Sequence, residues 1–115
     1  MLKEILNKFL ILNGVQAAVV IQENGEIIES MKSGISLDRN VKAALSRVMV
    51  DIKPAAAAFG NGPMSMVFLE YSDKFLILGP LEDEFFLIIV ARSTANIGQI
   101  SYEMKKNQEA IVSLL

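Results

Sequence analysis

The chain contains no cysteine and no histidine. Without cysteine it can form no disulfide bond, no thiolate metal site and no cysteine nucleophile. Without histidine it lacks the commonest general base and the commonest protein metal ligand. Both absences disfavour catalysis by the chain's own side chains. We therefore expect a protein that is not an enzyme and that uses no metal or cofactor.

Aromatic residues and net charge are also low. Aromatics make up 7% of the 115 residues although 52% are hydrophobic, so the apolar excess is aliphatic, and the mean hydropathy is +0.41. A small domain has little interior for so much aliphatic surface, and the surplus indicates an interface with another chain. The net charge of −2 disfavours nucleic acid as a partner.

Long apolar runs are absent. The uncharged stretch 54–69 is interrupted by Gly60-Asn61-Gly62-Pro63, and residues 85–91 are far shorter than the ~20 residues of a membrane-spanning helix. The N-terminus carries Lys3 and Glu4 without the apolar run of a signal peptide. We expect a cytoplasmic protein that does not insert into membranes.

Apolar periodicity predicts one domain over residues 1–115 with the element order α-β-β-α-β-β-β-α. The predicted helices cover 2–12, about 37–59 and 96–115, and the predicted strands cover 15–22, 26–31, 64–71, 74–78 and 84–92. Residues 15–22 and 84–92 are apolar on both faces, which predicts two central strands. Asn24-Gly25 predicts a two-residue type I′ turn, in which both residues have positive φ.

The predicted helix 37–59 is the most informative segment, and Ser36 is its expected N-cap. At 100° per residue a continuous apolar stripe forms along it. The stripe contains Leu37, Val41, Ala44, Leu45, Val48, Ile52, Ala55, Ala56 and Phe59. It keeps its phase across Pro54, which favours one helix, kinked or straight, over the alternative of a break at Lys53.

The opposite side of this helix is unusually small and apolar. It carries Ala43, Ser46, Val50 and Ala57, and a mostly basic rim flanks it with Arg39, Lys42, Arg47 and Lys53. Small residues allow another helix to approach closely. We interpret this side as a surface for a partner or a second copy; the alternative is an ordinary solvent face with high helix propensity.

The strand 64–71 supports the same interpretation. Neither of its faces is clearly polar, and its sequence neighbour 74–78 leaves one edge open. An exposed apolar edge promotes aggregation unless it is covered. Pairing with the same strand of a second copy would satisfy the edge by two-fold symmetry.

Three further segments have a chemical interpretation beside a plainer one. Gly60-Asn61-Gly62 could cradle phosphate but lacks a following Lys-Ser or Lys-Thr, so a helix-to-strand turn is favoured. The cluster 82–84 of three carboxylates could hold a cation, but solvated surface is favoured. Asn96-Ile97-Gly98 could bind an anion at a helix start, but a plain helix start is favoured.

Four segments in this order resemble the Roadblock domain, named after dynein light chains. They are Gly14-Val15-x-Ala17-Ala18-Val19-Val20, Glu23-Asn24-Gly25-Glu26-Ile27-Ile28-Glu29, Phe75-Leu76-Ile77-Leu78-Gly79-Pro80-Leu81 and Asn96-Ile97-Gly98. The resemblance covers nearly the whole chain. It implies an α/β (α+β) fold of the profilin or longin type, with a five-stranded antiparallel sheet in the order 2-1-5-4-3. One helix would lie on one face and the two terminal helices on the other.

The resemblance also implies a homodimer that scaffolds or regulates a small Ras-like GTPase, in some members by accelerating GTP hydrolysis through the GTPase's own residues. Carried over by position, the dimer interface comprises Val41, Ala44, Val48, Met64, Ser65, Met66, Val67, Phe68 and Leu69. The GTPase-facing patch comprises Arg39, Lys42, Ala43, Ser46, Arg47 and Val50.

Two other functions remain open from the sequence. A small-molecule sensor of the PAS or GAF type shares a sheet with flanking helices, and the run Ala55-Ala56-Ala57-Ala58 could leave the cavity that such a sensor needs. A passive assembly scaffold would need no GTPase.

Overall fold

The computed structural model describes residues 1–35, 39–60, 64–82 and 84–115, except the side chains of Lys42, Ser46 and Met49. The elements are α1 (Leu2–Ile11), β1 (Val15–Gln22), β2 (Ile27–Lys32), α2 (Arg39–Phe59), β3 (Val67–Glu70), β4 (Lys74–Glu82), β5 (Phe85–Arg92) and α3 (Ile97–Val112). The strands form one antiparallel sheet in the order β2-β1-β5-β4-β3. The predicted element order and strand order are both confirmed.

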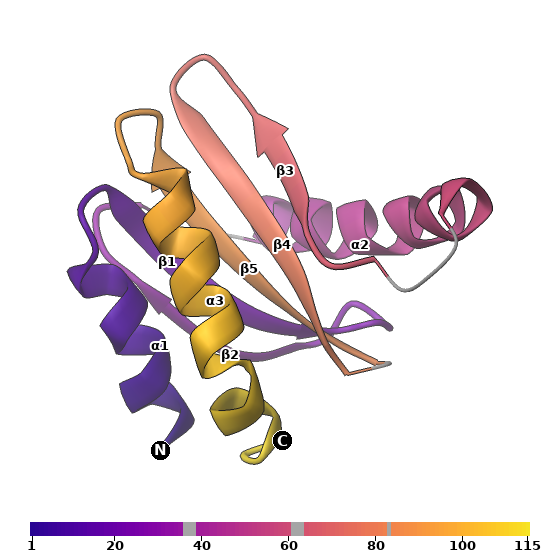
Figure 1. The fold of residues 1–115 in the computed structure, drawn as a ribbon, viewed down its shortest axis with the longest axis horizontal. Coiled ribbons are helices and arrows are strands. Elements are labelled where there is room, and N and C mark those ends of the chain that lie inside the picture. The colour runs from indigo at the N-terminus through magenta and orange to yellow at the C-terminus, as the bar shows by residue number, and fades with distance from the viewer. Residues whose placement is uncertain (36–38, 61–63, 83) are drawn as a thin grey trace.

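The sheet separates two apolar cores (Figure 1). On one face α1 contributes Leu6 and Phe9, and α3 contributes Ile100, Met104 and Ile111, all of them buried. On the other face α2 contributes a single buried side chain among those described, Leu45. The arrangement of one helix on one face and two on the other is therefore as predicted, but α2 is anchored much less deeply than α1 and α3.

The β1–β2 turn differs from the predicted type I′ turn. Gly25 has a φ of +95°, but no non-glycine residue among those described has positive φ, so Asn24 does not. Gln22 N–H bonds to the Glu26 carbonyl, and the Asn24 carboxamide oxygen accepts from Glu26 N–H at 2.9 Å. This is a three-residue loop that closes on a left-handed glycine. The side chain of Asn24 stabilises the turn without adopting the left-handed conformation itself.

The predicted boundaries of β3 and β4 are wrong. Residues 79–82, predicted as a loop, continue β4 and pair with β5, whereas β3 is only four residues long and its pairing ends at Val67–Leu78. Pro80 explains both observations. A proline has no N–H to donate, so β4 can continue alongside β5, but the opposite edge of β4 loses its partner strand at that point.

The predicted single helix across Pro54 is confirmed, because α2 runs unbroken from Arg39 to Phe59. The expected N-cap Ser36 and the predicted turn at 61–63 lie outside the described residues. The predicted stripe is wrong at three positions, since Ala44, Ala55 and Phe59 are exposed. The sheet-facing line instead contains Val41, Leu45, Val48, Ile52 and Ala56. Figure 1 shows that the end of α2 extends past β3, and Phe59 is the last residue of this helix.

A candidate surface for protein partners

The outer edge of the sheet is formed by β3, which pairs only with β4. Val67 and Leu69 are half-buried against the α2-side core, while Phe68 on the opposite face is 49% exposed. An apolar edge strand with free backbone groups is a ready template for another strand. Other edge strands are protected by charge, as β2 is by Glu29 and Lys32, but β3 carries only Glu70.

Helix α2 has an extensive uncovered apolar surface. Besides its half-buried sheet-facing line, it exposes Ala43, Ala44, Val50, Ala55, Ala57, Ala58 and Phe59. Phe59 is 96% exposed. An amphipathic helix on a monomer usually presents charged and polar groups on that side. Figure 1 shows α2 crossing behind β3, and the sheet-facing residues of α2 share a core with Val67 and Leu69 of this strand.

The residues predicted for a dimer interface divide into two groups in the structure. Val41, Val48, Met64, Val67 and Leu69 pack partly against the α2-side core, and Met66 packs against the other core. Ala44, Ser65 and Phe68 are exposed and free to contact another molecule. Of these three, only Phe68 belongs to β3, whose outer backbone edge is unpaired, while Ser65 precedes the strand and Ala44 lies on α2.

The residues predicted for a GTPase-facing patch lie on the outer side of α2. Arg39, Ala43, Arg47 and Val50 are exposed, and Val50 retains 43% of its surface. The side chains of Lys42 and Ser46 lie outside the described part of the chain. Arg47 Nε lies 3.0 Å from Asp51 Oδ2. Both partners are strongly exposed, so this pair adds little stability and leaves the guanidinium accessible.

The rim of α2 is also tied to the sheet by an ion pair. Lys53 Nζ lies 2.9 Å from Glu23 Oε2, at the end of β1. This contact links the second half of α2 to the β1–β2 turn. The two residues are 30 positions apart, so a local sequence pattern does not predict the contact.

A hollow of about 690 Å³ lies where β3 is too short to cover β4. Ala56 and Ala57 of α2 line one side and Met64 and Ser65 line another, with buried Phe86 below. Pro80, Leu81, Glu82, Lys53, Lys105 and Gln108 complete the lining. Gln108 Nε2 donates to the Pro80 carbonyl at 3.2 Å. The edge of β4 in the hollow thus lacks one N–H, and one of its carbonyls is already bonded.

The sequence carries only a partial signal for this hollow. The run Ala55–Ala58 suggests a cavity beside the second helix, and Ala56 and Ala57 do line the hollow. The prediction of a loop at Pro80 misses the early end of β3. The sequence prediction also places Phe59 in the core and omits Tyr71, which is 50% exposed at the end of β3.

The described residues include no group of three or more carboxylates, histidines or cysteines that could hold a metal ion, and no buried polar side chain. None of the described helices is long and apolar enough to cross a membrane. The surface formed by α2, the β3 edge and the hollow is the outstanding feature of the part of the chain that the structure describes.

A five-stranded antiparallel sheet in the order β2-β1-β5-β4-β3, with one helix on one face and two on the other, defines the fold class of the chain. Within that class, the Roadblock/LC7 domain family model matches residues 1–91. The chain belongs to the Roadblock/LC7 family.

Solved structures agree on the fold. The gliding protein MglB of Thermus thermophilus superposes with a TM-score of 0.82 at 17% identity, covering 98% of this chain and 87% of that one. MglC of Myxococcus xanthus gives 0.74 at 18% identity over the full length of both chains. A Roadblock/LC7 domain of Streptomyces avermitilis gives 0.81 at 14% identity, covering 96% and 94%. A comparison with curated protein sequences gave no match.

Proposed function

We propose that this chain is a homodimeric, non-catalytic regulator or scaffold of a small Ras-like GTPase. The observation that carries the proposal is the surface of α2. This helix of 21 residues buries one described side chain, Leu45, and exposes seven described alanine, valine and phenylalanine side chains, while the β3 edge of the sheet is unpaired. A monomer of this size gains nothing from that exposure, whereas an interface between chains would cover it.

The family resemblance supplies the expected partner, since the Roadblock domain implies a regulator of small Ras-like GTPases. A chain without histidine or cysteine would act through the GTPase's own catalytic residues. The basic rim, with Arg39 and Arg47, adds charge complementarity for an acidic surface and would raise the rate of association. The dimer uses the β3 edge, and the GTPase contacts the outer side of α2.

Three measurements test the proposal. Sedimentation equilibrium should show a concentration-dependent dimer, and a strictly monomeric protein would contradict the first half. Pull-down with GTPases of the same organism, locked in the GDP and GTP states, should show preference for the GTP state. A dimer that binds none of them would instead support a passive assembly scaffold. Hydrolysis by the bound GTPase, measured with and without the chain, then separates acceleration from scaffolding.

A further inference from the structure

The hollow beside β4 is suited to a side chain of another protein. Its floor and one wall are apolar, with Phe86, Leu81 and Ala57. Its polar lining, which includes Lys105 and Gln108, is exposed, and no described polar side chain of the molecule is buried. Small-molecule sites commonly hold a few fixed polar groups within an apolar cavity. That feature is missing among the described residues here.

The hydrogen bonding of β3 determines how a second copy can pair with it. Tyr71 N–H donates to the Lys74 carbonyl at 2.9 Å and so points toward β4. Backbone groups alternate in direction along a strand, so those of Leu69 and Val67 also point toward β4. Phe68 and Glu70 therefore present their N–H and carbonyl groups to the open edge.

Two-fold symmetry then leaves few registers. In an antiparallel pair, outward-bonding residues must face outward-bonding residues, so the axis passes through a residue of β3. An axis through Val67 would oppose the other three residues of β3 to residues 64–66, which lie outside the strand. An axis through Glu70 would oppose like charges, and an axis through Leu69 would oppose Phe68 to Glu70. An axis through Phe68 opposes two half-exposed aromatic rings, which is a favourable cross-strand pair.

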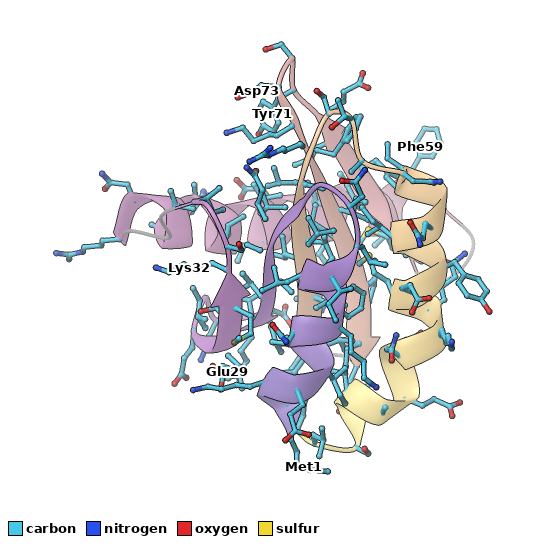
Figure 2. All side chains as sticks on the ribbon, turned by 90° about the vertical axis from the view of Figure 1, so that its left-hand side faces the viewer. Met1, Glu29, Lys32, Phe59, Tyr71 and Asp73 are labelled. Atoms are coloured by element: carbon cyan, nitrogen blue, oxygen red, sulfur yellow. The ribbon has the colours of Figure 1, made fainter. Side chains whose placement is uncertain are left out.

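Tyr71 and Ser65 flank β3 and are equally distant from Phe68, so continuation of the pairing past both ends of the strand would bring Tyr71 of one copy opposite Ser65 of the other. Ser65 lines the hollow. Tyr71 continues the alternation of Val67 and Leu69 and therefore lies on the α2 face of the sheet, the face from which Ala56 and Ala57 line the hollow. Figure 2 places Tyr71 near the tip of the β3–β4 hairpin, at the opposite end of the molecule from Met1.

We propose that two copies pair through β3 with the axis at Phe68, and that Tyr71 of each copy occupies the hollow of the other. The inference rests on the homodimer of the proposed function and specifies its register and its central contact. The aromatic ring covers Phe86 and the alanines, while Ser65, Lys105 and Gln108 offer hydrogen-bonding groups to the phenol. A buried tyrosine needs such a polar partner.

Disulfide trapping tests the register directly, because the chain contains no cysteine. Residues opposed in a hydrogen-bonded antiparallel pair have Cα atoms about 5.5 Å apart, within the range of a disulfide. Phe68→Cys should give a cross-linked dimer under mild oxidation, and Leu69→Cys should not. A mixture of Tyr71→Cys and Ser65→Cys chains should give a cross-linked heterodimer.

The outcomes separate this inference from the proposed function. If the wild-type chain is monomeric in sedimentation, the homodimer itself is wrong. If the chain is a dimer but only Leu69→Cys cross-links, or both variants cross-link equally, the Phe68 register is wrong and the homodimer stands. If Phe68→Cys cross-links but the Tyr71→Cys and Ser65→Cys mixture does not, the assignment of Tyr71 as the occupant of the hollow is wrong.

A complementation experiment tests the occupant without cross-linking. Tyr71→Ala removes the ring and Ala57→Trp fills the hollow, so each variant alone should dimerise about tenfold or more weakly than wild type. Mixed together, the two variants should form heterodimers in preference to homodimers. In the heterodimer, Tyr71 of the Ala57→Trp chain enters the open hollow of the Tyr71→Ala chain, and the filled hollow faces no tyrosine ring. The control is Ala58→Trp, whose site does not line the hollow; mixed with Tyr71→Ala, it should give no such preference. Absence of preferential pairing in the Ala57→Trp mixture would overturn the assignment.

Discussion

At the level of single residues, Gly14 and Gly34 have a positive φ, a backbone conformation that residues with a Cβ rarely adopt. Gly14 follows α1 with a φ of +86°, and a Cβ added there would lie 2.8 Å from the Cβ and 3.2 Å from the Cα of Ala95. Gly34 has a φ of +78°, but no atom of the described residues beyond its two chain neighbours lies within 4 Å of the position that a Cβ would occupy. The sequence predicts Gly14 as the end of a helix, but the close approach of Ala95, far along the chain, does not follow from local pattern.

Substitution of these two glycines by alanine should separate the cost of a positive φ from the cost of steric overlap with Ala95. Gly34→Ala should lower the free energy of unfolding by about 1–2 kcal/mol, the cost of a left-handed alanine. Gly14→Ala should cost more, about 3 kcal/mol, because rigid backbone atoms of Ala95 meet the new methyl group. Urea denaturation of both variants measures the difference. Equal losses would mean that the contact with Ala95 relaxes freely.

At the level of elements, the two terminal helices and the central strands could be predicted because their apolar patterns are long and regular. The first strand has its predicted bounds, Val15–Gln22, and α1 and α3 lie within a few residues of theirs at each end. β4 is harder to predict, because Gly79-Pro80 is locally typical of a turn. Its continuation depends on pairing with β5, which supplies a partner on the side where Pro80 needs no N–H.

The candidate surface was predictable only in part. The small-residue side of α2 and the open edge of β3 both follow from local pattern, and the structure leaves Ala43, Val50 and Phe68 exposed. The prediction for Phe59 is wrong because a helical wheel assumes that the sheet extends under the whole helix. The sheet ends at β3, so periodicity alone could not show that the last turn of α2 lies beyond it.

Pro54 lies inside α2 and lowers the stability of this helix. Proline has no N–H for the Val50 carbonyl, and its ring crowds the preceding turn, although the helix continues. Pro54→Ala should therefore raise the free energy of unfolding by about 1–3 kcal/mol, seen as a higher Tm in calorimetry. Pro54→Gly, which restores the N–H but is a poor helix former, should fall below the alanine variant by about 1 kcal/mol. An alanine variant no more stable than wild type would mean that a bend at Pro54 is needed for packing on the sheet.

The free edge of β3 can be blocked without disturbing its pairing with β4. Glu70 is exposed and presents its N–H outward, so Glu70→Pro should remove an edge donor in each copy and leave the β3–β4 ladder intact. We expect the dimer dissociation constant to rise about tenfold or more, with circular dichroism unchanged. Glu70→Ala is the matched control and should keep the dimer. Equal sedimentation of the two variants would exclude β3 as the pairing edge.

At the level of the whole molecule, the two cores differ in how completely they are covered. The α1–α3 side is packed around buried residues of both helices, whereas the α2 side relies on Leu45 and several half-buried neighbours. The α2 side and the adjacent edge expose Val50, Phe59, Phe68 and Tyr71, and the exposed basic residues Arg39 and Arg47 lie on α2 as well. One side of the molecule therefore combines the features of the proposed dimer interface and of the proposed GTPase-binding surface. Charge-reversal variants can distinguish the two interfaces.

The charge of α2 should affect the GTPase and not the dimer. Arg39→Glu combined with Arg47→Glu should weaken binding of the GTP-loaded partner at least about tenfold, mainly through slower association, while sedimentation still shows the dimer. Raising the salt concentration should weaken wild-type binding in the same direction, since exposed charges are screened. The matched control is Lys3→Glu with Lys8→Glu, the same charge change on exposed positions of α1 on the opposite face of the sheet. If both double variants lose affinity equally, the effect is one of net charge, and the outer side of α2 is not the GTPase-binding surface.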